Sequence, residues 1–209
     1  MQFIVLNRLY AKLLKGYNLI MMKKCFLLFA LLFFQFSFSQ ENKLSLAALE
    51  LTKEKVVYDP SYFSISYPNG EIPKGKGVCT DVIIRVYRKI GIDLQKEVHE
   101  DMKTNFSKYP KLWGLKSTDK NIDHRRVPNL MTYFKRKQAE KTISRNPKDY
   151  LPGDIVAWNL GDAITHIGIV VHKKSLDKKR NLIVHNIGSG QVLEDCLFSY
   201  KIIGHYRFR

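Results

Sequence analysis

The chain has 209 residues, of which 45% are hydrophobic, and its 35 Lys and Arg outnumber its 19 Asp and Glu to give a formal net charge of +16 at pH 7. This length allows one domain with a substantial hydrophobic core. The charge is spread along the chain, and neither a zinc-finger spacing nor an RNA-binding signature accompanies it, which argues against a nucleic-acid partner.

The N-terminal segment has the layout of a secretory signal peptide. A basic stretch at 22–24 precedes the apolar run CFLLFALLFFQFSF at 25–38, and small residues precede the boundary between Ser39 and Gln40. This layout predicts cleavage near that boundary, with residues 1–20 as an upstream extension. The apolar run is short for a membrane span, and an uncleaved anchor is the alternative.

Cleavage would remove residues 1–39 and leave residues 40–209 as a single domain. We therefore expect a periplasmic or secreted protein without a stable membrane span. The domain stays strongly basic after cleavage, and a basic exported protein suits an anionic envelope polymer such as peptidoglycan, anionic lipid or polysaccharide.

The first half of this domain shows helical periodicity interrupted by loops. Pro and Gly gather in Tyr58–Gly77, which predicts a long loop, and Leu112–Arg126 reads as a second loop. Pro128 is tolerated in the first turn of the helix that follows. Apolar residues at helical spacing predict four helices, at Leu44–Val57, Cys79–Ile90, His99–Tyr109 and Val127–Gln138.

The sequence period changes after LPGD at 151–154. Short β-rich runs, separated by turn-prone or charged stretches, then predict four strands, at Ile155–Leu160, Ile164–His172, Leu182–Ile187 and Ile202–Phe208. Because the helices come first and the strands later, the predicted fold class is α+β with a small antiparallel, barrel-like sheet.

A cysteine stands at the start of the second predicted helix. Cys79 begins an apolar stripe at helical spacing that continues with Val82, Ile83, Val86 and Tyr87. A thiol at this place lies beside unpaired main-chain N–H groups and the positive end of the helix dipole, which favour a thiolate and can stabilise an oxyanion. We therefore predict a lowered pKa for the Cys79 thiol, although a buried inert cysteine fits the same stripe.

Two histidines are expected at the same end of one hairpin. His166 shares a strand face with Gly168, whose small size lets another element approach closely. An antiparallel hairpin centred near Asp177 brings His185 to the start of that strand. A base and its orienting partner need this arrangement, although two unrelated strand histidines fit the same pattern.

Two other roles for these residues stay open. In an oxidising compartment Cys79 and Cys196 could form a disulfide, whereas we expect Cys79 to be a free thiol and Cys196 a packing residue. Zinc ligation by Cys79 with His166, His172 and His185 is the second alternative, but their spacing matches no standard zinc motif. We therefore predict no metal site.

The motifs together resemble a known group of enzymes. VCTDVIIRVYRKIGIDL, LPGDIVAW, HIGIVV and IVHN follow the motif order of the NlpC/P60 superfamily of papain-like cell-wall cysteine peptidases. More closely, YDPSYFSISYPNGEIPKGKGVCTDVIIRVYRKIGIDLQKEVHEDM, NIDHRRVPNL and GHYRFR are similar to the domain-of-unknown-function 1287 family (DUF1287), over 44–209. The resemblance implies a papain-like α+β fold, with N-terminal helices packed on a small antiparallel sheet or barrel.

The resemblance also implies a Cys-His-His site that needs no cofactor. Cys79 matches the nucleophile, His166 the general base and His185 the third, orienting residue. Asp154 of the Pro-Gly-Asp motif matches a structural signature at a turn or strand start rather than a catalytic group.

Residues on the substrate side are implied less directly. Tyr67 matches a tyrosine that many of these enzymes place ahead of the nucleophile. The carboxylate that the superfamily places directly before its cysteine is absent, and Asp81 stands two positions after the cysteine instead. Arg125 and Arg126 could bind substrate carboxylates in bidentate fashion, or could be surface charges or an ion pair with Asp123.

These roles imply an exported cysteine hydrolase that cleaves an amide bond in peptidoglycan or another cell-envelope substrate. Two alternatives stay open. A domain with a decayed site would be a non-catalytic wall-binding or envelope-binding module, and a thioester intermediate would also serve an acyltransferase.

Overall fold

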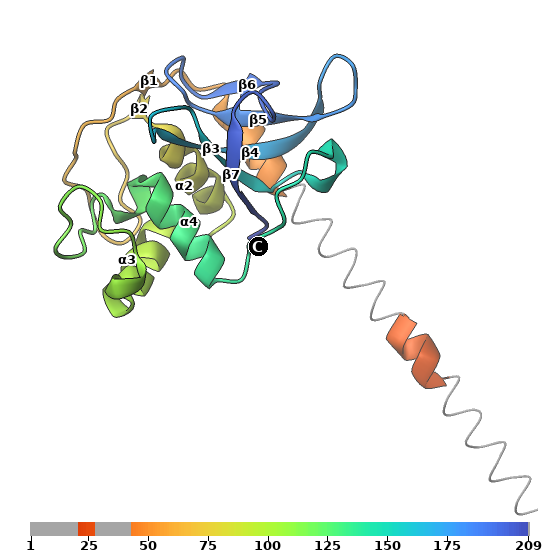
Figure 1. Ribbon diagram of the computed structural model, residues 1–209, viewed down its shortest axis with the longest axis horizontal. Coiled ribbons are helices and arrows are strands. Elements are labelled where there is room, and N and C mark those ends of the chain that lie inside the picture. Colours follow the sequence, from red (N-terminus) through yellow and green to blue (C-terminus); the bar gives the residue numbers. More distant parts are fainter. Residues whose placement is uncertain (1–20, 28–42, 209) are drawn as a thin grey trace, which may run out of the picture. The chain divides into compact units, whose positions relative to one another are not determined.

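The computed structural model describes residues 21–27 and 43–208 (Figure 1). The chain divides into two units, Met1–Ser39 and Gln40–Arg209, which are described separately. In the first unit residues 21–27 form a helix with exposed side chains. The rest of the predicted signal peptide and its cleavage point lie outside the described residues. Within the described ranges, no helix combines the length and the apolar character needed to cross a membrane.

The second unit opens with a helix at 43–51. This helix ends earlier than predicted, because the chain turns at 52–53 and then extends into β1 (Val57–Tyr58). β1 pairs in parallel with β2 (Lys76–Gly77), and Tyr58 stands opposite Gly77. The predicted long loop is therefore closed at its two ends by this short ladder, which places Tyr58 close to the start of the next helix.

Three further α-helices follow in the first half of the unit. α2 (Cys79–Lys89) and α4 (Val127–Arg136) confirm the predicted helices to within two residues. α3 (Leu94–Thr104) begins earlier than predicted because the Asp93 side chain caps it, accepting a hydrogen bond from Lys96 N–H at 3.1 Å. Three 3₁₀ turns complete the helical part, at Phe106–Lys108, Asp123–Arg125 and Pro147–Asp149.

A five-stranded sheet forms the second half of the unit. Its order is β6-β5-β4-β3-β7, and every pairing between neighbours is antiparallel. The strands are β3 (Ile155–Asn159), β4 (Thr165–Lys174), β5 (Asn181–His185), β6 (Val192–Glu194) and β7 (Lys201–Tyr206). The predicted α+β class and antiparallel sheet are confirmed, and β6 is an additional strand.

The sheet is open rather than barrel-like. β6 and β7 form its two edges, and no pairing joins them within the part of the chain that the structure describes. β6 has only three residues, so it continues the sheet for a short distance beyond β5. The expected small barrel is therefore corrected to an open sheet with helices beside it (Figure 1).

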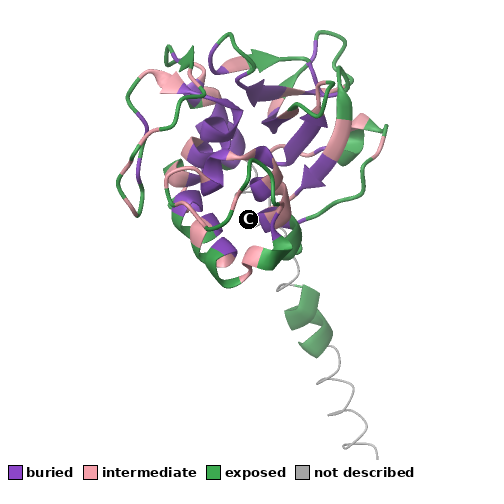
Figure 2. Ribbon diagram, turned by 60° about the vertical axis from the view of Figure 1, so that its left-hand side comes forward, coloured by how far each residue is buried: buried purple, intermediate pink, exposed green. Residues whose placement is uncertain are grey.

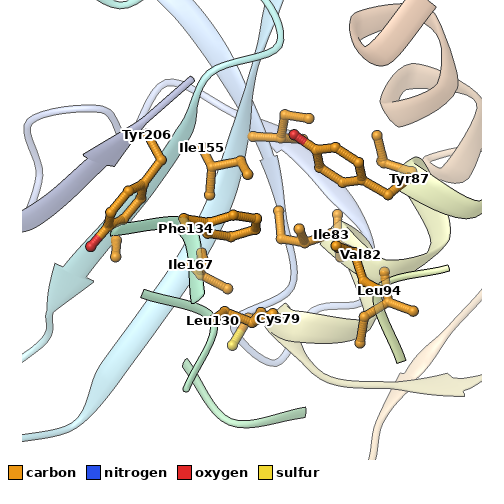
Figure 3. Packing of buried hydrophobic residues seen from close by; sticks show 14 of the residues in the cluster. Cys79, Val82, Ile83, Tyr87, Leu94, Leu130, Phe134, Ile155, Ile167 and Tyr206 are labelled. Carbon is orange, nitrogen blue, oxygen red and sulfur yellow. The ribbon is translucent and has the colours of Figure 1, made fainter. Parts of the chain in front are cut away.

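Buried side chains form two clusters, one for each face of the sheet. Figure 2 shows that the strands and the helices beside them carry many of the buried residues. The larger cluster joins the helices to Ile155, Ile167 and Ile169 of the strands, and Figure 3 shows part of it. The smaller cluster packs Trp158 and Val170 under the chain that follows β6. Alternate residues of β3 and β4 thus face different cores, as the period of a strand requires.

The Pro-Gly-Asp motif forms a buried polar turn before β3. The Asp154 carboxylate accepts hydrogen bonds from Leu151 N–H at 2.9 Å and from Arg207 Nε at 2.7 Å, and its Oδ2 lies 2.8 Å from His205 Nε2. Burial alone would raise the pKa of Asp154, but the bonds with Arg207 and His205 outweigh it and hold the pKa below its ordinary value of 3.8. The predicted structural role of Asp154 agrees with this geometry.

Replacing Asp154 with asparagine is expected to remove an acid-dependent part of the stability. The contribution of the carboxylate is fully present above its ordinary pKa of 3.8 and is lost as the pH falls through the lower pKa of the folded state. Tm measured across acidic pH should fall steeply below about pH 4 in the wild type and less steeply in the variant, whose Tm starts lower. Parallel curves for the two proteins would contradict this role.

Candidate active site

Cys79 is the first residue of α2 and is 7% exposed. It packs in the larger cluster with Leu130 and Ile167 (Figure 3). The Asp81 carboxylate caps the helix, since its Oδ2 accepts a hydrogen bond from Val78 N–H at 2.7 Å. The predicted position of the thiol at a helix start is confirmed.

The acid–base state of Cys79 differs from the prediction. Burial raises the pKa of the thiol to about 12, and hydrogen bonding with the main chain of Ile167 offsets only part of that rise. The carboxylate of Asp81 raises the pKa further. The expected lowering is wrong for this structure, because desolvation penalises a thiolate and outweighs the main-chain hydrogen bonds at the helix start. Cys79 is a neutral thiol at physiological pH.

The two histidines meet as the hairpin predicted. In the sheet Gly168 stands opposite His185, and a Cβ added to Gly168 would lie 3.0 Å from the Cβ of His185 and 2.7 Å from a methyl carbon of Ile183. Only a glycine permits this close approach. His166 Nε2 lies 2.8 Å from His185 Nδ1, and the His166 ring stacks on Trp158.

The histidine pair ends on a carboxylate that the sequence did not point to. His185 Nε2 lies 2.8 Å from Glu194 Oε2. Burial lowers the pKa of both imidazoles, that of His166 to about 3, so both rings are neutral. A carboxylate only accepts, so His185 donates through Nε2 to Glu194 and accepts through Nδ1 from His166 Nε2–H. This order leaves His166 Nδ1 as an unprotonated nitrogen able to take a proton.

The structure brings the histidines to each other but not into hydrogen-bond contact with the thiol. Among residues 43–208, no hydrogen bond joins Cys79 to His166 or to His185. The thiol lies against the main chain of Ile167, directly after His166, whereas the His166 ring stacks on Trp158 of the smaller cluster. The predicted convergence of the three side chains is therefore incomplete.

The two cysteines of the second unit do not form a disulfide. Cys79, Cys196 and Cys25 are all free, as predicted for Cys79. Cys196 is buried in the smaller cluster, as expected of a packing residue, and Cys79 is in the larger one. Cys196 also has a contact that the sequence did not predict, since its Sγ lies 3.6 Å from His185 Nε2.

The four donors considered for zinc do not gather. His172 Nδ1 lies 2.7 Å from Ser45 Oγ, because the register of β4 against β5 shifts between Val170 and Lys174. A different set, His185, Glu194 and Cys196, has donor atoms within 4.8 Å of one another. Such donors can hold a zinc ion. Because His185 Nε2 already bonds Glu194 at 2.8 Å, we do not assign a metal to this set of donors.

A small cavity of about 190 Å³ opens beside Cys79. Its lining residues come from the loop before α2, the loop before α4 and the start of β4, and include Tyr58, Trp113, Arg126 and Thr165. Burial first, and then the nearby Cys79 and Asp81, raise the pKa of Tyr58, which is 40% exposed. Tyr58 thus lies near the thiol, in the same cavity lining as Cys79.

Two of the residues expected on the substrate side have structural partners elsewhere. Tyr67 is not part of this cavity, since its hydroxyl donates to Glu100 Oε1 at 3.3 Å and its ring packs edge-on against His99. Asp81 is committed to a buried ion pair with Arg125, whose Nε lies 3.0 Å from Oδ1.

The two arginines of the NIDHRR motif differ in role. Arg125 pairs with Asp81 rather than with Asp123, which bonds His99 Nδ1 at 2.9 Å. Arg126 lines the cavity, and its guanidinium lies 4.5 Å from the centre of the Trp113 ring. Of the four residues expected on the substrate side, Arg126 is thus the one whose side chain lines the cavity without a carboxylate partner in the described residues.

Sequence reasoning missed Glu194, Tyr58 and Trp113. Glu194 lies on the short strand β6, which carried too few β-forming residues to be predicted. Tyr58 could have been found, because it belongs to the same loop as Tyr67 and β pairing with Gly77 carries it toward the cysteine. Trp113 lies in a loop, where no periodic pattern fixes its position.

A comparison with known protein families matches the part of the chain that contains all of these residues. The family model described as "Domain of unknown function (DUF1287)" matches residues 45–208. The "Uncharacterized protein YijF" of Escherichia coli (strain K12) is 50% identical over 151 residues, which make up 72% of this chain and 73% of that protein.

Proposed function

This chain belongs to the family described as domain of unknown function 1287, and from its site we propose that it is a cysteine hydrolase of amide bonds in peptidoglycan or another cell-envelope substrate. The observation that carries the proposal is the hydrogen-bonded series Glu194–His185–His166, which ends on β4 at the residue directly before Ile167, whose main chain Cys79 contacts. The motif order shared with NlpC/P60 peptidases supports a papain-like fold for this family.

Because the Cys79 thiol and the His166 imidazole are both neutral, we assign general-base catalysis rather than attack by a preformed thiolate. Cys79 Sγ attacks the amide carbonyl carbon while its proton passes to His166 Nδ1. The C–N bond then breaks as His166 returns that proton to the departing amine, and a thioester remains. Water, deprotonated by the same nitrogen, adds to the thioester. The C–S bond then breaks as His166 returns that proton to Cys79 Sγ, which releases the acid and restores the neutral thiol.

The thiol and imidazole have to meet when substrate binds. Catalytic hydrogen bonds are often long or unmade in free enzymes and form only in the complex. The Cys79 side chain packs on the face of the sheet that the helices cover, and the His166 ring stacks on Trp158 at the other face, so the start of β4 has to shift for this contact to form. The bond from His166 Nε2 to His185 keeps the ring in its tautomer. Main-chain N–H groups of Cys79 and Thr80 already interact with the sulfur and are the donors that we assign to the oxyanion.

Two further features support a substrate in the cell envelope. The signal-peptide layout of residues 22–39 directs the domain to the periplasm or the outside of the cell. The domain left after cleavage stays strongly basic, which favours adsorption to an anionic polymer such as peptidoglycan. A non-catalytic binding module and a thioester-based acyltransferase remain as the two rival functions.

Incubation of the purified domain with muropeptides and with intact sacculi tests the proposal. We expect soluble products whose masses together exceed that of the substrate by one water, and no such products with Cys79→Ala. Binding to sacculi without products from the wild type would favour the binding module. Products in which an added amine replaces water would favour the acyltransferase. Circular dichroism of Cys79→Ala, with a spectrum matching the wild type, shows that the variant is folded.

A further inference from the structure

The cavity beside Cys79 has a positive charge that no acidic group balances. Two arginines line it, and no aspartate or glutamate is among its lining residues. Arg125 is neutralised by Asp81, with Nε–Oδ1 and Nη2–Oδ2 separations of 3.0 and 3.2 Å. The guanidinium of Arg126 is therefore the uncompensated charge in the lining.

Arg126 is held in place without a hydrogen-bonding partner. Its Nη1 is buried and unpaired, and the described residues give its guanidinium neither a hydrogen bond nor an ion pair. The nearest acid in sequence, Asp123, bonds His99 Nδ1 at 2.9 Å and Asp119 N–H at 2.8 Å through its Oδ2, and it forms no ion pair with Arg126. A buried donor left unpaired is costly, so an arginine kept in this state is suited to an external acceptor.

The ring of Trp113 lies against this guanidinium. The Arg126 Cζ lies 4.5 Å from the centre of the indole ring, and Trp113 is 61% exposed. Stacking of this kind holds the plane of the guanidinium while leaving its edge for acceptors. The cavity thus presents a planar cation at its rim beside the buried thiol.

We propose that Arg126, stacked on Trp113, is a subsite for a carboxylate that the substrate carries close to the amide bond attacked by Cys79. This inference rests on the proposed function and names its substrate class, which is an acyl donor with a free carboxylate near the scissile carbonyl. A carboxylate matches the two-pronged edge of a guanidinium and pairs the open donor. A cavity of about 190 Å³ holds a group the size of a small residue, so the carboxylate is within one residue of the bond.

Two small alkylating reagents test the subsite without a known substrate. Iodoacetate and iodoacetamide are nearly equal in size and transfer their CH₂ carbon to the thiolate with loss of iodide, but only iodoacetate carries a carboxylate. At one fixed alkaline pH, the ratio of the iodoacetate rate to the iodoacetamide rate at Cys79 should be about tenfold higher in the wild type than in Arg126→Gln. Peptide mapping by mass separates Cys79 from Cys196.

Matched controls keep the result specific. Lys135→Gln removes an equal charge from an exposed side chain outside the cavity, and it should leave the ratio at the wild-type value. The same ratio at Cys196 should not respond to Arg126→Gln. An equal ratio at Cys79 in wild type and Arg126→Gln would overturn the proposal.

A second measurement covers the case in which neither reagent reaches Cys79. In that case the Arg126 side-chain ¹⁵N resonances are followed during titration with acetate and with acetamide. A saturable shift with acetate alone supports the subsite, and no difference between the two compounds overturns it. A wild-type preference for iodoacetate together with uncleaved muropeptides would retain the subsite and reject the hydrolase, so the two proposals can fail separately.

Discussion

Replacing His166 with alanine is expected to lower the rate of amide hydrolysis by about 10³-fold, within the range that a general base contributes. His166 Nδ1 is the unprotonated nitrogen at the end of the series Glu194–His185–His166, and it is the group that we assign to take the thiol proton. Turnover of the muropeptide that the wild type cleaves is the measurement. His172→Ala is the matched control, because His172 lies on the same strand but bonds Ser45.

Glu194→Gln separates a positioning role from a merely structural one. Glutamine keeps the size of the side chain but can donate to His185 Nε2, which would reverse the order of donors and place a proton on His166 Nδ1. We expect turnover to fall by about tenfold or more while Tm stays unchanged, because Glu194 acts on His166 only through its bond to His185. Wild-type turnover in both His166→Ala and Glu194→Gln would reject the histidine series as the base.

Replacing Asp81 with asparagine is expected to destabilise the fold by about 3–5 kcal/mol, the cost of removing one partner from a buried ion pair. The side chains of Arg125 and Asp81 are 1% and 5% exposed, so the guanidinium would stay buried without its counter-charge. Asp81 also caps α2 through Val78 N–H, and asparagine keeps an acceptor oxygen for that bond. Free energies of unfolding from urea titration measure the effect.

An exposed ion pair provides the control for this effect. Glu140→Gln removes the partner of Lys135, whose side chain is 67% exposed, and should cost no more than about 1 kcal/mol. A change of that size for Asp81→Asn would mean that Arg125 finds another acceptor, such as the main-chain carbonyl of Ser61 that it already reaches at 3.0 Å. In that outcome the burial of Arg125 would not depend on Asp81 as its partner.

Local patterns were enough to predict the order of elements. The stripe that begins at Cys79 places the thiol at the start of α2, and Pro128 marks the first turn of α4. Gly168 on β4 indicated a close approach by another strand, and His185 is the residue that approaches. These features are decided by neighbours within a few residues or by one hairpin, so periodicity and turn residues contain them.

Only the tertiary structure decided which charged groups meet and which are buried. The pairing of Asp81 with Arg125, the end of the histidine series at Glu194 and the open donor of Arg126 all join segments far apart in sequence. The raised pKa of Cys79 has the same origin, because a helix start favours a thiolate only while water or a cation reaches it. Desolvation and long-range pairing depend on packing between elements, and no local pattern records that packing.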